Sequence, residues 1–227
     1  MGNSMRYGIV RKNKFLFFIL MCLCVVLTSC SSTKKSDNVN NNETVTQSSH
    51  QETEIRVSEI FNSEERRIWY WLRDIAYNES IREICVLENG RVTTYYHQTS
   101  IGSTGLGITF EDLDGMTDDE IIAYLESENN IEKSEEQNLE FYYKKDDTGN
   151  SLSKEIIGGF EYFPDFFIEN IIEPKTILSN KFFGFKGVSS GNNCYLISKY
   201  DFGNNTKIIL NDIKDEGMVY YYDRHNN

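Results

Sequence analysis

The stretch REICVLENGRVTTYYH, residues 82–97, predicts a β-hairpin and sets the character of the fold. Two arms rich in β-branched and aromatic residues flank Asn89-Gly90, and this dipeptide between such arms is the strongest short-range hairpin signal. Asn and Gly both tolerate the positive φ angles that a type I′ turn requires. In that register Glu88 lies opposite Arg91, where an exposed ion pair contributes little to stability.

The C-terminal half of the chain continues this pattern of strands and turns. The segments LEFYYKK (139–145) and KEIIGGFEYF (154–163) predict two strands around the turn DDTGN. Turn residues at 202–205, Phe-Gly-Asn-Asn, separate later strands. Four closing strands are predicted in all, at KFFGFKGV (181–188), CYLISKYDF (194–202), TKIILND (206–212) and MVYYYD (218–223).

Helices are predicted at three places. In residues 63–77, Ile68, Leu72 and Ile75 fall on one helical face, and Asn62 with Glu65 has the spacing of an N-terminal cap. The acidic segment 111–125 lacks the spacing of a calcium-binding EF-hand loop. Its Thr-Asp-Asp-Glu sequence at 117–120 instead predicts a capping box that opens a helix.

The third predicted helix is short and covers residues 164–172, with Pro164 in its first turn. Together these segments give two or three helices and about eight strands joined mostly by short turns. The sequence therefore predicts an α+β fold, a single domain built on a mostly antiparallel sheet.

The N-terminal 29 residues have the three zones of an export signal. A basic start without acidic residues precedes an apolar core at 15–27, which is shorter than the roughly 20 apolar residues of a comfortable membrane span. Small residues then lead up to a cysteine. The basic residues of this leader are Arg6, Arg11, Lys12 and Lys14.

Leu27-Thr28-Ser29-Cys30 resembles the lipobox of bacterial lipoproteins. The resemblance covers only the leader and Cys30. It implies that a diacylglyceryl group is attached to the Cys30 thiol and that a signal peptidase recognises Leu27, Thr28 and Ser29 and cuts before Cys30. Acyl chains on that residue would hold the protein on a lipid bilayer, with the rest of the chain exported from the cytoplasm.

Composition divides the remaining chain into a tether and a globular part. Residues 30–54 hold the lipidated cysteine and a polar tract too poor in apolar residues to offset the entropy of ordering, whereas residues 55–227 have a globular composition. The leader contains four of the 23 basic residues and none of the 35 acidic ones, so the chain from residue 30 carries a formal charge of −16. Such a surface disfavours nucleic acid as a partner.

Two cysteines, Cys85 and Cys194, remain in the globular part. Their apolar surroundings predict buried small side chains, and export also allows a disulfide between them. A cysteine hydrolase would pair one of them with His97. No zinc-ligand spacing and no cofactor fingerprint is present, so no metal or cofactor is predicted.

Two functional hypotheses follow. The first is a non-enzymatic, membrane-anchored lipoprotein that binds an envelope protein or polymer. The second is an envelope hydrolase acting on peptidoglycan, peptide or glycan, which would need a cysteine–histidine pair or a pair of carboxylates in a cleft.

Overall fold

The computed structural model describes residues 52–97, 105–161, 164–203 and 205–222. These residues belong to one compact unit that spans 48–227. The predicted leader, Cys30 and all of the predicted tether up to residue 51 lie outside the described residues.

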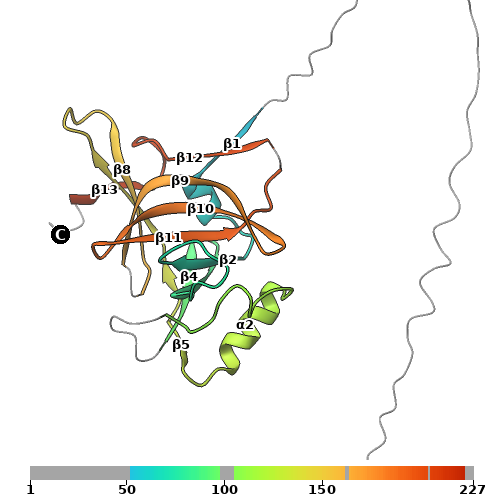
Figure 1. Cartoon of the computed structure of the whole chain (residues 1–227). Helices are drawn as coiled ribbons and strands as arrows, with labels where there is room; N and C mark the ends of the chain where they lie inside the picture. Colours follow the sequence, from blue (N-terminus) through green and yellow to red (C-terminus); the bar gives the residue numbers. More distant parts are fainter. Residues whose placement is uncertain (1–51, 98–104, 162–163, 204, 223–227) are drawn as a thin grey trace, which may run out of the picture. The chain divides into compact units, whose positions relative to one another are not determined.

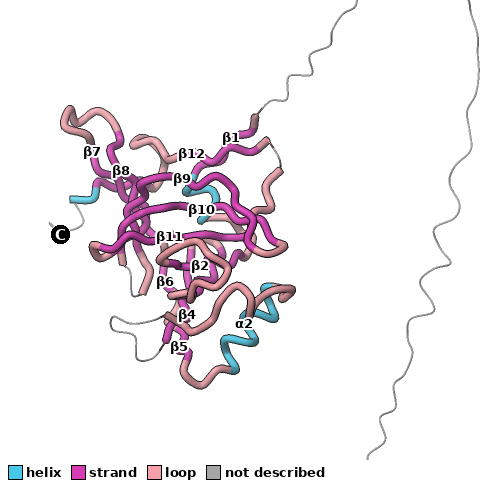
Figure 2. The backbone as a smooth tube through the Cα atoms, in the orientation of Figure 1, coloured by secondary structure: helices cyan, strands magenta, loops and turns pink. Residues whose placement is uncertain are grey.

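The described part of the chain contains thirteen strands and two helices (Figures 1 and 2). In chain order they are β1 (Thr53–Arg56), α1 (Val57–Phe61), β2 (Arg67–Leu72), β3 (Glu83–Glu88), β4 (Arg91–His97), α2 (Asp118–Ser127), β5 (Ile131–Lys133), β6 (Gln137–Asn138), β7 (Glu140–Lys145), β8 (Leu152–Gly158), β9 (Asp165–Ile177), β10 (Asn180–Ser189), β11 (Asn192–Lys199), β12 (Thr206–Ile209) and β13 (Met218–Tyr220).

The predicted hairpin at 82–97 is confirmed. Strands β3 and β4 pair in antiparallel register, with Glu88 opposite Arg91. Asn89 and Gly90 have φ angles of 54° and 70°, as a type I′ turn demands. The guanidinium of Arg91 makes its ion pair with Glu136, which lies outside the hairpin.

The main sheet curls round so that the chain entering β7 bonds to β4. From β7 its strands run β7–β8–β9–β10–β11–β2–β3–β4, and all of these neighbours pair in antiparallel fashion. Strand β13 pairs in parallel with the other edge of β7. At the far edge of β4 lie β5 and β6, and only Leu139 separates β6 from β7. The backbone N–H of Leu139 donates to the carbonyl of Gly90 at 2.8 Å. The segment 131–145 therefore bonds to β4 through β5 and β6 and to β8 through β7, which closes the sheet between β4 and β8.

Eight strands contribute one face each to a single apolar cluster inside the closed sheet. Helix α1 adds Val57, Ile60 and Phe61 to the same cluster. The strand residues of this interior cluster are Trp69, Trp71, Cys85, Leu87, Val92, Phe141, Ile157, Phe166, Ile168, Phe183, Phe185, Cys194 and Leu196. The interior is thus filled by side chains, many of them aromatic.

A second apolar cluster covers the outer face of β11, β2, β3 and β4. Helix α2 packs there through Ile121 and Leu125, together with apolar residues of the segment 106–113. The predicted capping box is confirmed, since Thr117 N donates to Glu120 Oε2 at 2.9 Å and Glu120 N donates to Thr117 Oγ1 at 3.3 Å. The box fixes the start of α2 over this outer cluster.

The helix predicted at 63–77 is wrong, because residues 67–72 form strand β2. All six residues of β2 are buried: Trp69 and Trp71 face the interior, and Tyr70 and Leu72 face the outer cluster. A strand covered on both faces shows a continuous apolar run instead of alternation, so its period is hidden. Asn62 ends helix α1 and does not begin another helix.

The short helix predicted at 164–172 is also wrong, because this segment belongs to the 13-residue strand β9. Phe166 and Ile168 face the interior cluster, and β9 pairs with β8 on one side and β10 on the other. Strand β1 is a further difference. It begins at Thr53, inside the predicted tether, because its residues pair in parallel with β12.

The prediction of the fold class is right in its coarse part. The described chain is mainly β, its sheet is dominated by antiparallel pairs, and it has two helices. The four closing strands and the pair β7–β8 overlap their predicted segments, whereas two of the three predicted helices contain strands. Strand β8 ends at Gly158 and β13 at Tyr220, before the predicted ends, and residues 162, 163 and 223 lie outside the described residues.

The first testable prediction concerns Gly187 in β10, where the closed sheet leaves no room for a side chain. A Cβ atom at this position would meet the backbone oxygen of Phe167 and, at 2.8 Å, the ring of Phe166. Gly187→Ala should lower the free energy of unfolding by about 1–3 kcal/mol, measured by urea denaturation. Gly203→Ala is the matched control, because a Cβ there meets no atom within 4 Å. Equal stability of the two variants would contradict the tight packing of β9 on β10.

Candidate functional site

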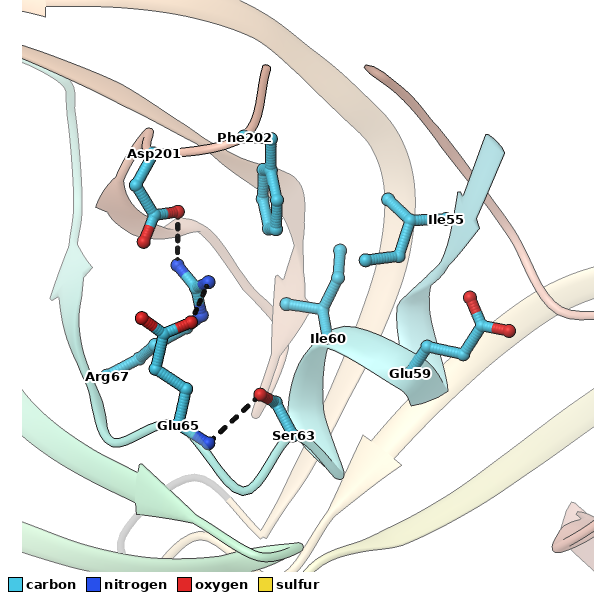
Figure 3. A pocket seen from close by; sticks show the side chains of 8 residues that line it. All are labelled: Ile55, Glu59, Ile60, Ser63, Glu65, Arg67, Asp201 and Phe202. Carbon is cyan, nitrogen blue, oxygen red and sulfur yellow. Dashed lines mark hydrogen bonds and ion pairs between the residues drawn. The ribbon is translucent and has the colours of Figure 1, made fainter. Parts of the chain in front are cut away.

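A cavity of about 340 Å³ opens between helix α1, the start of β2 and the segment that follows β11 (Figure 3). Its residues come from opposite ends of the described chain. The lining residues are Ile55, Glu59, Ile60, Ser63, Glu65, Arg67, Asp201 and Phe202.

Helix α1 forms one wall because its apolar face is anchored in the interior cluster. The ring of Phe61 stacks on Trp69 with centroids 4.5 Å apart and planes 20° from parallel. At the start of the helix, Arg56 N donates to Glu59 Oε2 at 2.9 Å. These contacts fix α1 against the sheet, and Glu59, which is exposed, is one of the lining residues that this helix contributes.

Arg67 is the central polar residue of the cavity. Its side chain is almost fully buried, and its two terminal nitrogens donate to different carboxylates: Nη1 to Asp201 Oδ1 at 2.5 Å and Nη2 to Glu65 Oε2 at 2.9 Å. The guanidinium carbon also lies 4.8 Å from the centre of the Phe202 ring. Arg67 therefore ties the segment after β11 to the segment before β2 (Figure 3).

The cavity has an acidic rim and an apolar wall. Three carboxylates, on Glu59, Glu65 and Asp201, stand against the single guanidinium of Arg67, which leaves a formal charge of −2. The apolar wall consists of Ile55, Ile60 and Phe202. Such a combination of convergent polar groups and apolar surface in one hollow is typical of a ligand site.

The two predicted core cysteines are both buried, with free thiols and no disulfide between them. Cys85 lies in β3 and Cys194 in β11, and both side chains belong to the interior cluster. Burial raises the pKa of the Cys85 thiol, and burial is also the main cause that raises the pKa of Cys194 to about 12. Thiols held in the protonated form are poor nucleophiles.

His97 lies on the opposite face of the sheet from both cysteines. Cys85 is opposite Thr94 in the β3–β4 ladder, and His97 is three residues further along β4. Because side chains alternate along a strand, His97 shares the face of Tyr95, which belongs to the outer cluster. The structure therefore does not bring together the cysteine–histidine pair of the hydrolase hypothesis.

Two buried glutamates were not singled out from the sequence. Glu155 in β8 accepts hydrogen bonds from Asn211 N at 3.0 Å and Asn211 Nδ2 at 2.9 Å, and burial raises its pKa to about 7. Asn211 in turn accepts from Ser58 of α1. This network fastens α1 and the C-terminal segment to the sheet, so its role is structural.

Glu83 in β3 faces the interior beside Trp71 and is only 4% exposed. Its Oε2 atom has no hydrogen-bond partner within the described part of the chain. Burial is the main cause that raises its pKa to about 8, against the opposing influence of Arg82. Neither Glu83 nor Glu155 lines the cavity.

The described residues contain no group of three or more His, Cys, Asp or Glu side chains able to hold a metal ion. Among the same residues, no helix has the length and hydropathy needed to cross a membrane. Comparisons with protein-family models, with curated proteins and with solved structures found no match.

Sequence reasoning missed the cavity, although its residues carry weak signals. The sequence pattern predicts Glu65 in a helix cap and Phe202 in a turn. Arg67 directly precedes the apolar run of β2, and a lone charge at the end of a buried strand needs a partner. That signal could have marked Arg67, but the sequence does not say that Asp201 supplies the partner.

The second testable prediction concerns Glu83 and pH. The native state keeps this carboxyl protonated up to about pH 8, whereas the unfolded chain releases the proton near its ordinary pKa of 4.5. The stability that the protonated group contributes is therefore complete below pH 4.5 and is lost as pH rises towards 8. Between pH 5.5 and 7.5, the free energy of unfolding of the wild type should fall by roughly 2–3 kcal/mol more than that of Glu83→Gln.

Urea denaturation at the two pH values measures this difference. Glu155 titrates in both proteins, so its contribution cancels. The exposed Glu111→Gln is the control and should follow the wild type. Parallel pH profiles for the wild type and Glu83→Gln would contradict a buried, protonated Glu83.

Proposed function

We propose that this chain is a bacterial lipoprotein, held on a membrane by an acylated Cys30, whose single domain acts outside the cytoplasm as a non-enzymatic binding protein. The leader and the lipobox-like residues 27–30 support export and membrane anchoring. The observation that carries the binding role is the cavity around Arg67, where acidic groups and an apolar wall converge.

The hydrogen bonds and the burial of the acidic side chains favour binding over hydrolysis. In the cavity, Glu65 and Asp201 both accept hydrogen bonds from Arg67, so an oxygen of each carboxylate is already engaged within the protein. The protonated acid Glu83 is buried away from the cavity. A glycoside hydrolase needs one carboxyl group that donates a proton and a second that acts as base or nucleophile, both facing the substrate.

The third testable prediction concerns the anchor. Cys30→Ala should abolish the incorporation of radiolabelled palmitate and release the protein from the membrane fraction, because the acylated thiol is missing. Cys24→Ala is the matched control, since Cys24 lies in the leader that is removed. Palmitate labelling and membrane retention of Cys30→Ala at the wild-type level would refute the lipoprotein assignment.

The fourth testable prediction concerns the cavity. A photo-cross-linking amino acid in place of Ser63, which lines the cavity, should give one adduct of defined mass on intact cells. The same amino acid in place of the exposed Glu111, outside the cavity, should not give that adduct. Mass spectrometry identifies the captured component. Identical patterns from the two positions, or no adduct from Ser63, would refute a binding role for the cavity.

A further inference from the structure

We infer that the cavity around Arg67 binds a short peptide segment of a partner protein, and that it recognises a basic side chain beside an apolar one. This inference rests on the proposed binding function and adds the chemical class of the ligand.

The charge of the cavity selects a cation. Arg67 is the only basic residue of the lining, and both of its terminal nitrogens already donate to Asp201 and Glu65. These two carboxylates offset the charge of the guanidinium and leave the lining negative overall, which disfavours an incoming anion. A cation meets a site with a formal charge of −2, in a protein whose exported part carries −16 and attracts positive ligands over a distance.

Glu59 is the carboxylate best placed to meet this cation. It is exposed, it lines the cavity, and it makes no bond to Arg67. Its Oε2 atom accepts the backbone N–H of Arg56, and the carbonyl of a glutamine could accept the same bond. Glu59 can therefore be neutralised without removing the contact that opens helix α1.

The apolar wall selects a hydrophobic neighbour. Ile55 and Ile60 approach Phe202 across the hollow, and the guanidinium of Arg67 lies against the Phe202 ring (Figure 3). A hydrophilic cation alone would leave this apolar surface in contact with water. The volume of about 340 Å³ is at the small end of the usual 300–1,000 Å³ for ligand sites, and it suits a few side chains better than a folded surface.

The neighbouring strand β1 favours a peptide over a free amine. It pairs with β12 along one edge, and no other described strand pairs with it. Thr53 and Glu54 are exposed, and Ile55 of the same strand lines the cavity. An extended peptide can bond to such an edge through its backbone while its side chains enter the adjoining hollow.

The fifth testable prediction uses defined peptides as probes. Isothermal titration calorimetry of the full-length mature protein would be done with acetyl-Gly-Leu-Lys-Phe-Gly-amide and three analogues. In the first analogue, Nε-acetyl-lysine replaces the lysine and removes the charge. In the second, serines replace the leucine and phenylalanine. In the third, glutamate replaces the lysine. Butylamine serves as a cation without a peptide.

The parent peptide should bind at least about tenfold more tightly than each analogue and than butylamine, and salt should weaken its binding. Glu59→Gln should weaken the parent peptide about two- to fivefold, as expected for one exposed ion pair. Glu111→Gln makes the same change of charge outside the cavity and should leave the affinity unchanged.

Equal affinity for the lysine and acetyl-lysine peptides, tighter binding of the glutamate peptide, or equal binding of butylamine would overturn the inference. So would a failure of every probe to bind. The Ser63 cross-link separates the two proposals: an adduct from Ser63 without peptide binding leaves the binding function standing and removes the basic-peptide ligand. No adduct and no peptide binding removes both.

Discussion

The closed sheet depends on the burial of β2 on both of its faces. Trp69 and Trp71 point into the interior, and Tyr70 and Leu72 point into the outer cluster. The ring of Trp69 lies within 6 Å of Phe61, Phe183 and Phe185, which come from helix α1 and strand β10. Aromatic side chains of this size supply much of the apolar area that a small domain can bury. One short strand therefore holds the helix, the sheet and the outer layer together.

The filling of the interior also decides where a ligand site can lie. An eight-stranded closed sheet is just wide enough to be filled by side chains or to hold one small ligand, and here the aromatic rings fill it. The polar side chains of the cavity therefore lie at the end of the sheet, where β2 begins. Arg67 is the first residue of β2, and its position next to Trp69 on the same face brings a charged group to the border of the apolar interior. The acidic partners of Arg67 then form the cavity rim.

Features encoded by neighbouring residues could be predicted from the sequence. The Asn89-Gly90 turn and the Thr117 capping box each involve contacts within a few residues, and both were found correctly. Strand β2 was mistaken for a helix because Ile68, Leu72 and Ile75 match a helical spacing, and β9 because Pro164 is typical of a first helical turn. In β2, burial on both faces had removed the alternation that would have indicated a strand. The cavity joins Ile55 to Phe202, and contacts over such a separation are set by sheet closure, which local patterns do not encode.

The pairing of β1 with β12 has a mechanical consequence. Four residue pairs in parallel register hold β1, and Ile55 within this strand is also a wall of the cavity. Any tension on the chain before Thr53 reaches the described domain through this strand first. Tension along the strand axis loads the four pairs together, in shear, so β1 resists a pull as a unit. If it yields, the cavity loses the Ile55 side of its wall. The force that separates β1 from β12 thus sets the highest tension at which the cavity can keep a bound ligand.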